Sequence, residues 1–262
     1  MARASDWSRE QLLVAFKLYC QLPFGKIHHR NSEIVRLATL IGRTPSAVAM
    51  KLVNIASLDP KITSTGRRGL TGASNADRAM WSEMQSDWES FAVNAEDAAL
   101  AFGIDEREDD DDAAPEMPEM PPTFVGESRR VLSNARNRQA FFRKCVLSAY
   151  SAQCCISGLS VPRLLIASHI TPWKDDADNR LNPHNGLCLS ALHDRAFDAR
   201  LIYLNDRLEV MLTTRLTRKK LDSFTRSAIT SYEGKQIAIP EKFAPDMRFV
   251  KQHRDAALRG AA

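Results

Sequence analysis

The apolar residues near the start of the chain recur at the spacing of a helix. Leu12, Leu13, Phe16 and Tyr19 fall on one helical face when the sequence is wound at 3.6 residues per turn. Asp6, just ahead of this run, is a residue type whose side chain accepts hydrogen bonds from the first backbone amides of a helix. The pattern therefore predicts an amphipathic helix that begins directly after Asp6.

Two further helices are predicted on either side of a glycine turn. Asn31 or Ser32 can cap a helix with a regular apolar face, and the segment Gly42-Arg43-Thr44 interrupts it. Thr44 then caps a third helix, in which Pro45 takes the first position. A helix, a glycine-containing turn and a second helix form the helix-turn-helix pattern, which many DNA-binding proteins use.

The N-terminal part resembles Myb-like tri-helical domains. The resemblance rests on the aromatic start Trp7-Ser8-x-Glu10 and on the segment IGRTPSAVAMKL. It implies that the helix after the turn reads base edges, and a basic glycine-rich loop follows at 66–72. The residues expected to contact DNA are Arg43, Ser46, Lys51 and Asn54 on the turn and helix, and Arg67 and Arg68 in the loop.

Farther along, Trp81, Trp88 and Phe91 predict one more amphipathic helix, whose aromatic face we expect to lie in the core. The segment 105–122 then separates two parts of the chain. It is rich in proline and holds nine acidic residues and one arginine, a net charge of −8. Such a composition buries too little apolar surface to offset chain entropy, so we expect a disordered linker. The predicted domains are therefore 1–104, helical and DNA-recognising, and 123–262.

The C-terminal part alternates short apolar runs with helical patterns. A helix is predicted from Arg136 to Ser151, and buried strands are predicted at Leu164–Ala167 and Leu187–Leu189. A helix from about Ala191 to Ala199 follows the second strand. Two strands and a helix around a polar loop predict a ββα unit, and with the helical N-terminal part they predict an α+β fold class.

The charge distribution favours a polyanionic partner for the C-terminal part. Residues 123–262 hold 23 basic and 13 acidic side chains, a net charge of +10 in a chain whose total is +4. A basic domain attracts nucleic acid. The N-terminus lacks the apolar core of a signal peptide, and no apolar run approaches the ~20 residues of a membrane span. We therefore expect a cytoplasmic protein with no membrane partner.

The string ASHITPWKDDADNRLNPHNGLCLSALHDRAFDARLI, from Ala167 to Ile202, resembles the HNH, or ββα-metal, nuclease superfamily. The variant it resembles occurs in restriction endonucleases and bacterial antiphage effectors. Weaker similarity, including FFRKCVLSAY and YEGKQIAIPEKFAP, extends over most of 123–250. The resemblance implies an endonuclease that hydrolyses phosphodiester bonds of double-stranded DNA with one divalent cation per site and leaves 3′-hydroxyl ends.

The same resemblance assigns two catalytic residues. His169 stands in the place of the general base, and an imidazole pKa near ~6.5 suits that role at neutral pH. Asn185 matches the middle asparagine of the family, which fixes the loop that carries the base. An Asn-Gly pair is also a common turn, and Asn182 is a competitor for the same role.

The metal ligands implied by the family spacing are Asp194 and Asp198, which share one helix face and would bind Mg²⁺ or Mn²⁺. His193 is the alternative ligand and lies about 100° round the helix from Asp194. Many family members have Asp or His just before the general base as a further ligand. This chain has Ser168 there, and a hydroxyl is a weaker ligand.

Many relatives hold a structural zinc ion between two CxxC knuckles. Here the corresponding segments 155–158 and 188–191 keep one cysteine each, so we predict no structural zinc. The cysteines are odd in number and show no disulfide framework, as expected in a reducing compartment. They are Cys20, Cys145, Cys154, Cys155 and Cys188.

Arg180 and Arg195 border the motif and are expected to contact the DNA backbone, whereas Trp173 is expected to pack. The layout favours restriction of foreign DNA, with modified DNA as one option. Two alternatives stay open. One is an effector or toxin nuclease whose N-terminal domain binds a partner or a signal, and the other is a catalytically inactive DNA-binding regulator. The sequence leaves the oligomeric state open, with a homodimer among the options.

Overall fold

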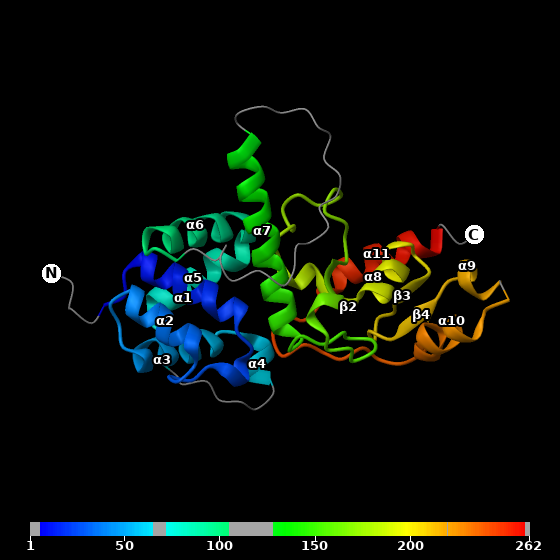
Figure 1. Cartoon of the computed structure of the whole chain (residues 1–262), viewed down its shortest axis with the longest axis horizontal. Helices are drawn as coiled ribbons and strands as arrows, with labels where there is room; N and C mark the ends of the chain where they lie inside the picture. The colour runs from blue at the N-terminus through cyan, green and yellow to red at the C-terminus, as the bar shows by residue number, and fades with distance from the viewer. Residues whose placement is uncertain (1–5, 65–71, 105–127, 219, 260–262) are drawn as a thin grey trace. The chain divides into compact units, whose positions relative to one another are not determined.

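The computed structural model describes residues 6–64, 72–104, 128–218 and 220–259, without the side chains of 128–137. The chain separates into two compact units, Met1–Cys145 and Val146–Ala262 (Figure 1). Arg67, Arg68 and the predicted linker lie outside the described residues, so the predicted domain boundaries stay a prediction. In the described part of the chain, no helix is long and apolar enough to cross a membrane.

The N-terminal unit is helical throughout its described part. Its elements are α1 (Arg9–Gln21), the 3₁₀ turn η1 (Phe24–Lys26), α2 (Ser32–Leu40), α3 (Pro45–Ala56), α4 (Pro60–Ser64), α5 (Asn75–Ser86), α6 (Trp88–Ala101) and the first part of α7 (Ser128–Ala149). The core contains Phe16, Ile34, Leu52 and Phe91, each fully buried on a different helix. The predicted helical domain is confirmed at this level.

Helix caps explain most of these boundaries. Asn31 accepts from the amides at the start of α2, and Thr44 accepts from an amide of α3 with Pro45 at its first position, both as expected. The first helix differs. Its cap is Ser8, because Ser8 and Gln11 form a reciprocal capping box, and the prediction that Asp6 caps this helix is wrong.

The single amphipathic helix predicted around Trp81 and Trp88 is two helices in the structure. Asp87 ends α5 and its carboxylate accepts from the amide of Ser90, so the same residue caps α6. The aromatic residues are nevertheless core, as expected, since Trp88 is 3% and Phe91 0% exposed. A mid-segment aspartate is a strong start signal for a helix, and it outweighs the continuous apolar period.

The C-terminal unit is built on a β-hairpin followed by a helix. Its elements after α7 are η3 (Pro162–Leu164), β1 (Leu165–His169), η4 (Pro183–Asn185), β2 (Gly186–Ser190), α8 (Ala191–Asp198), β3 (Ile202–Leu204), β4 (Val210–Leu212), α9 (Thr214–Thr217), α10 (Ser223–Ala228), η5 (Thr230–Tyr232) and α11 (Met247–Arg259). Strands β1 and β2 are antiparallel, with Ser168 opposite Leu187 and His169 opposite Gly186. The predicted ββα unit and the α+β class are both confirmed.

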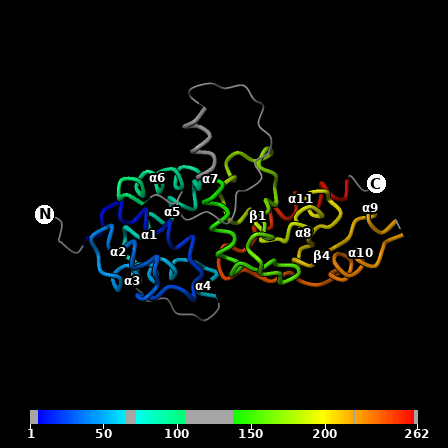
Figure 2. Tube along the Cα trace, viewed as in Figure 1, coloured from blue at the N-terminus to red at the C-terminus, as the bar shows by residue number. Residues whose placement is uncertain are grey.

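Helix α11 packs beside α8, which the red and yellow parts of the trace show (Figure 2). The ring of His253 stacks on Phe197 of α8, with centroids 3.6 Å apart and planes 4° from parallel. His253 Nε2 donates to the Phe197 carbonyl at 3.1 Å. Burial, with a smaller effect of Arg200, lowers the pKa of His253 from 6.5 to about 4, against the opposing effect of that hydrogen bond.

This shift predicts that acid weakens the C-terminal unit. Between pH 6.5 and pH 4, His253 is protonated in the unfolded chain but stays neutral in the folded chain. The free energy of unfolding therefore falls as the pH falls. In urea unfolding followed by tryptophan fluorescence, the wild type should therefore lose more stability from pH 7 to pH 5 than His253→Phe does. The difference should be about 2 kcal/mol. A His29→Phe control, at an exposed site, should behave like the wild type, and equal losses in all three proteins would contradict the prediction.

Candidate active site

The general-base candidate sits at the end of β1, where the hairpin opens into a long polar loop. His169 is the last residue of the strand, and the loop returns to β2 at Gly186, which pairs with His169. The neighbouring loop residue Ile170 donates its amide to the Asn185 carbonyl at 2.9 Å. The loop is therefore closed at its base, and the histidine stands at a fixed point of the backbone.

One ring nitrogen of His169 has a defined role. Nε2 lies 2.9 Å from the Arg180 carbonyl, and a carbonyl can only accept, so Nε2 carries the proton and Nδ1 carries the lone pair. Burial lowers the pKa of His169 below its ordinary value, and the bond to Arg180 opposes this only in part. Trp173 contacts the ring edge-to-face at 5.5 Å. The imidazole is thus neutral at pH 7, oriented, and able to accept a proton through Nδ1.

Asn185 spans the loop that carries His169. Its Oδ1 accepts from the Thr171 amide at 2.8 Å, and its Nδ2 donates to the carbonyls of Thr171 at 3.1 Å and Asn179 at 3.3 Å. The residue is 1% exposed, so these bonds satisfy an amide that is shielded from water. This arrangement suits the loop-fixing role that the family resemblance implies.

Asn182, the competitor for that role, is used differently. Its Oδ1 accepts from the His184 amide at 3.0 Å, which caps η4, and its Nδ2 donates to Asn179 Oδ1. These bonds stabilise the return of the loop, whereas those of Asn185 hold the backbone of Thr171, two residues after His169. The geometry therefore favours Asn185 as the residue that holds the general base.

The two carboxylates proposed for the metal lie on α8, which contacts both strands of the hairpin. Burial raises the pKa of Asp194, although nearby Ser168 and Arg195 oppose the rise. Burial and the charge of Asp194 raise the pKa of Asp198, again against Arg195. Two carboxyl groups one helical turn apart therefore repel each other in a partly desolvated place, and a cation bound between them would relieve this repulsion.

Ser168 adds a third oxygen to this pair. It is 2% exposed, and among the described residues its Oγ has no partner of ordinary hydrogen-bond geometry. It is nevertheless close enough to Asp194 to lower the pKa of that carboxyl group. Hard oxygen donors of this kind suit Mg²⁺ or Mn²⁺ and do not suit soft metals.

The fit is that of a sparse site. Within the described ranges, no group of three or more His, Cys, Asp or Glu side chains is arranged to hold a metal. The donor set offered by the protein is Asp194, Asp198 and the Ser168 hydroxyl, so water and substrate phosphate would fill the other positions of an octahedral ion.

His193, the alternative ligand, faces the inside of the unit. It is 3% exposed, its Nε2 donates to the Ala228 carbonyl at 2.9 Å, and its Nδ1 lies 2.9 Å from Ser190 Oγ. Tyr232 contacts the ring edge-to-face at 5.3 Å. Both nitrogens thus have protein partners, which disfavours His193 as a metal ligand and favours Asp194.

The two segments that keep one cysteine each of a zinc knuckle, 155–158 and 188–191, lie side by side in the structure. The Cys155 amide donates to the Cys188 carbonyl at 2.8 Å, and Cys154 Sγ lies 3.6 Å from His193 Nδ1. All five cysteines are buried. The sequence analysis gives Cys154 no separate role. Burial raises its pKa, but hydrogen bonding with His193 and Ser157 outweighs burial and lowers the pKa to about 6. The absence of structural zinc stays a prediction.

The two arginines beside the site differ in their exposure and in their contacts. Arg195 is exposed on α8 near the two carboxylates. The Arg180 guanidinium lies over the Trp173 ring at 5.2 Å and donates through Nε to the Trp173 carbonyl at 2.9 Å. Trp173 therefore packs, as expected, between a cation and the imidazole of His169. Arg195 is the better placed of the two arginines for a phosphate contact.

The structure turns part of the predicted DNA-reading set inward. Arg43 donates to the Asp6 carbonyl and to Gln11, and its guanidinium lies over the Trp7 ring at 5.1 Å. Lys51 is 8% exposed and its ammonium lies 2.8 Å from Asp77 Oδ1. Both cations hold the N-terminal unit together, and their positions disfavour a direct role in DNA contact.

The other two candidates on α3 also differ. Asn54 packs against Gly72, where an added Cβ would lie 3.1 Å from Asn54 Oδ1. Ser46 is exposed in the first turn, where the recognition helix of a helix-turn-helix protein meets the bases. Of the predicted DNA-contacting residues that the structure describes on this helix, Ser46 alone keeps a solvent-facing position, and contact there stays a prediction.

Lys51→Ala should therefore destabilise the N-terminal unit and not merely change its DNA preference. The substitution leaves the carboxylate of Asp77, which is 0% exposed, without its counter-charge. Breaking such a buried pair costs about 3–5 kcal/mol. Urea unfolding followed by tryptophan fluorescence would measure the loss, with Lys26→Ala, at an exposed site, as the control. Unchanged stability together with weaker DNA binding would restore Lys51 as a reader.

Comparison with known proteins places the site in a family. No curated protein matches the chain. Residues 154–205 match the family model HNH_2, described as an HNH endonuclease. The matched segment contains β1, η4, β2 and α8, and with them every catalytic and metal-ligand candidate. The C-terminal unit of this chain therefore carries a domain of the HNH endonuclease family.

Proposed function

We propose that the chain is a divalent-metal-dependent DNA endonuclease that acts in restriction of foreign DNA. The observation that carries the proposal is the oriented, neutral imidazole of His169 at the end of β1. The preceding residue, Ser168, lies close to the carboxylate of Asp194. A proton acceptor and an oxygen-rich metal position on one ββα unit are the two groups that phosphodiester hydrolysis requires.

In this mechanism His169 Nδ1 removes a proton from the attacking water, while Nε2 keeps its bond to the Arg180 carbonyl. Asn185 holds the backbone of Thr171 on both sides, which keeps the imidazole in place during the proton transfer. Asp194 and Asp198, with Ser168, would hold the divalent cation. That cation, when bound, supplies Lewis-acid stabilisation of charge on the leaving oxygen. Arg195 contacts the phosphate backbone.

The charge of the C-terminal part supports a nucleic-acid substrate. Its net charge of +10 gives affinity for phosphates through counterion release, without reading sequence. We therefore expect double-stranded DNA as the substrate and binding that weakens steeply with added salt. Site choice would then come from the N-terminal unit, through Ser46 and the basic segment that contains Arg67 and Arg68.

Incubation of the purified full chain with supercoiled plasmid tests the proposed activity. Mg²⁺ or Mn²⁺ should produce nicked and linear DNA, and EDTA should stop the reaction without unfolding the protein, because the carboxylate pair is not part of the core. Parallel digestion of methylated and unmethylated phage DNA tests the restriction role. Cleavage that persists in EDTA would exclude the proposed metal dependence.

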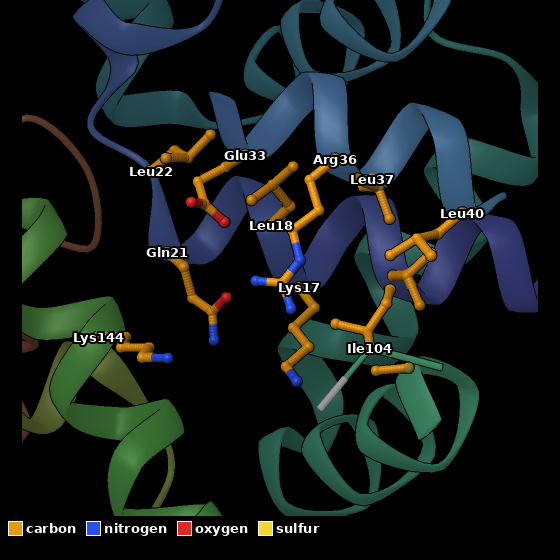
Figure 3. Close-up of a pocket in the computed structure, with 12 residues that line it drawn as sticks. Lys17, Leu18, Gln21, Leu22, Glu33, Arg36, Leu37, Leu40, Ile104 and Lys144 are labelled. Carbon is orange, nitrogen blue, oxygen red and sulfur yellow. The ribbon is translucent and has the colours of Figure 1, made fainter. Parts of the chain in front are cut away.

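A second candidate is an effector nuclease whose N-terminal unit binds a signal or a partner. The observation in its favour is a cavity of about 440 Å³ between α1 and α2, which Figure 3 shows. Lys17, Arg36 and Lys144 bring positive charge to its wall, Glu33 brings one negative charge, and the other lining residues are mostly apolar. Lys17 is held there by Glu96 at 2.5 Å. Such a cavity suits an anionic group with an apolar body.

Two acidic substitutions on the full chain separate the candidates. If the N-terminal unit reads DNA, Ser46→Glu should weaken binding or change the cleavage map, and Arg36→Glu should leave both unchanged. If it binds a signal, Arg36→Glu should alter protection of host cells against phage, while the purified protein keeps the DNA affinity of the wild type. Both positions are exposed, so neither change should affect folding.

A further inference from the structure

The general base and the two carboxylates of the nuclease site lie on different segments, and helix α11 contacts both segments. The general base stands before the loop from Ile170 to Asn185, and the carboxylates stand on α8. Helix α11 contacts both segments through neighbouring residues, Gln252 and His253. Successive helical residues point about 100° apart, so one turn of helix can reach two directions at once. Both residues lie beyond the family match at 154–205.

The first contact fixes the loop. Thr171 Oγ1 donates to Gln252 Oε1 at 2.9 Å, and the Thr171 backbone is already held on both sides by Asn185. Thr171 is 7% exposed and lies two positions after His169. With its backbone and its side chain both bound, Thr171 is an anchor for the start of the loop, and Gln252 supplies the side-chain part of it.

The second contact fixes the end of α8. His253 Nε2 donates to the Phe197 carbonyl, which also accepts from the Arg200 amide at 2.8 Å, and its ring stacks on Phe197. A carbonyl oxygen has two lone pairs, so His253 adds a side-chain donor to a helix-end carbonyl that a backbone amide already binds. Phe197 immediately precedes Asp198 on α8. The position of the Phe197 backbone therefore determines the position of the Asp198 side chain.

We propose that α11 holds the two halves of the nuclease site in register, with Gln252 and His253 as positioning residues for His169 and Asp198. This inference rests on the proposed function and extends it to a helix outside the matched domain. Neither residue touches the reacting atoms. Each acts through one intermediate, Thr171 for the base and Phe197 for the carboxylate. Loss of such an outer partner typically costs roughly 10–100-fold in activity or metal affinity.

A double-mutant cycle on the full chain tests the loop contact. Thr171→Val and Gln252→Leu remove the donor and the acceptor without changing side-chain size greatly. Each should lower the single-turnover cleavage rate roughly tenfold, and the double variant should fall no further, because both remove one interaction. Thr171→Ser, which keeps the hydroxyl, should retain the wild-type rate. Multiplied effects in the double variant would overturn the loop half of the proposal.

Mn²⁺ affinity, measured by titration calorimetry, tests the helix contact without relying on activity. His253→Phe keeps the ring stack and removes the donor, so it should weaken Mn²⁺ binding roughly tenfold while the chain still melts cooperatively. His253→Gln keeps a donor and should bind closer to the wild type. Lys251→Ala, at an exposed site on the same helix, is the control. Wild-type Mn²⁺ affinity in folded His253→Phe would overturn the helix half.

Amide hydrogen exchange of the segment from Ile170 to Asn185 makes the outcome independent of cleavage. Gln252→Leu should speed exchange there, and His253→Phe should not. If the wild type cuts no DNA yet these exchange and Mn²⁺ effects appear, the proposed function fails and the positioning role stands. If the wild type cuts DNA and neither effect appears, the positioning role fails and the proposed function stands.

Discussion

His169→Ala should abolish cleavage and leave the fold and DNA binding intact. The substitution removes the nitrogen that accepts the water proton, and a positioned general base contributes ~10²–10⁴-fold to rate. The ring is only partly buried at the end of β1, so its loss should cost little packing. Single-turnover cleavage of a plasmid at saturating Mg²⁺, together with a filter-binding measurement, would separate rate from affinity.

The matched control for this variant is His29→Ala, at an exposed position of the N-terminal unit. It removes an imidazole of the same chemistry and should cut like the wild type. Asn185→Ala should resemble His169→Ala in direction, since it releases the loop that positions the base. Cleavage by His169→Ala at the wild-type rate would refute the assigned mechanism and the proposed function with it.

Asp194→Asn should raise the Mg²⁺ or Mn²⁺ concentration needed for half-maximal cleavage, and the double variant with Asp198→Asn should lose detectable activity. Amide oxygens carry no charge, so they cannot offset the dication in a partly desolvated place. A bound divalent cation would contribute several kcal/mol to the transition state, so its loss should slow cleavage by roughly 10²-fold or more. A metal titration of single-turnover rates measures both quantities. Asp178→Asn, exposed in the polar loop, is the control.

His193 provides the contrasting result. Its nitrogens face Ala228 and Ser190 inside the unit, so His193→Ala should lower stability and leave the metal concentration for half-maximal rate unchanged. A folded His193→Ala protein with a strongly raised metal requirement would reverse this assignment. In that case His193 would bind the metal, and Asp194 would be the solvated acid of a helix start.

The site illustrates which features are local in sequence. The hairpin and α8 follow one another in the sequence, so His169, Asn185 and Asp194 all lie on one ββα unit. The caps at Asn31 and Thr44 are likewise decided by neighbours a few positions away. Where two local signals compete, the capping signal prevails, and Asp87 divides a segment whose apolar period alone predicts one helix.

Partners far apart in the chain decided the remainder. From the sequence alone, Lys51 is interpreted as an exposed lysine on a helix. In the structure it is buried in an ion pair with Asp77 on another helix. Gln252 and His253 carry no motif, and only the packing of α11 brings them to Thr171 and Phe197. A single sequence shows local spacing and helical period, whereas the burial of a charge or the bracing of a loop depends on which distant surfaces meet when the chain compacts.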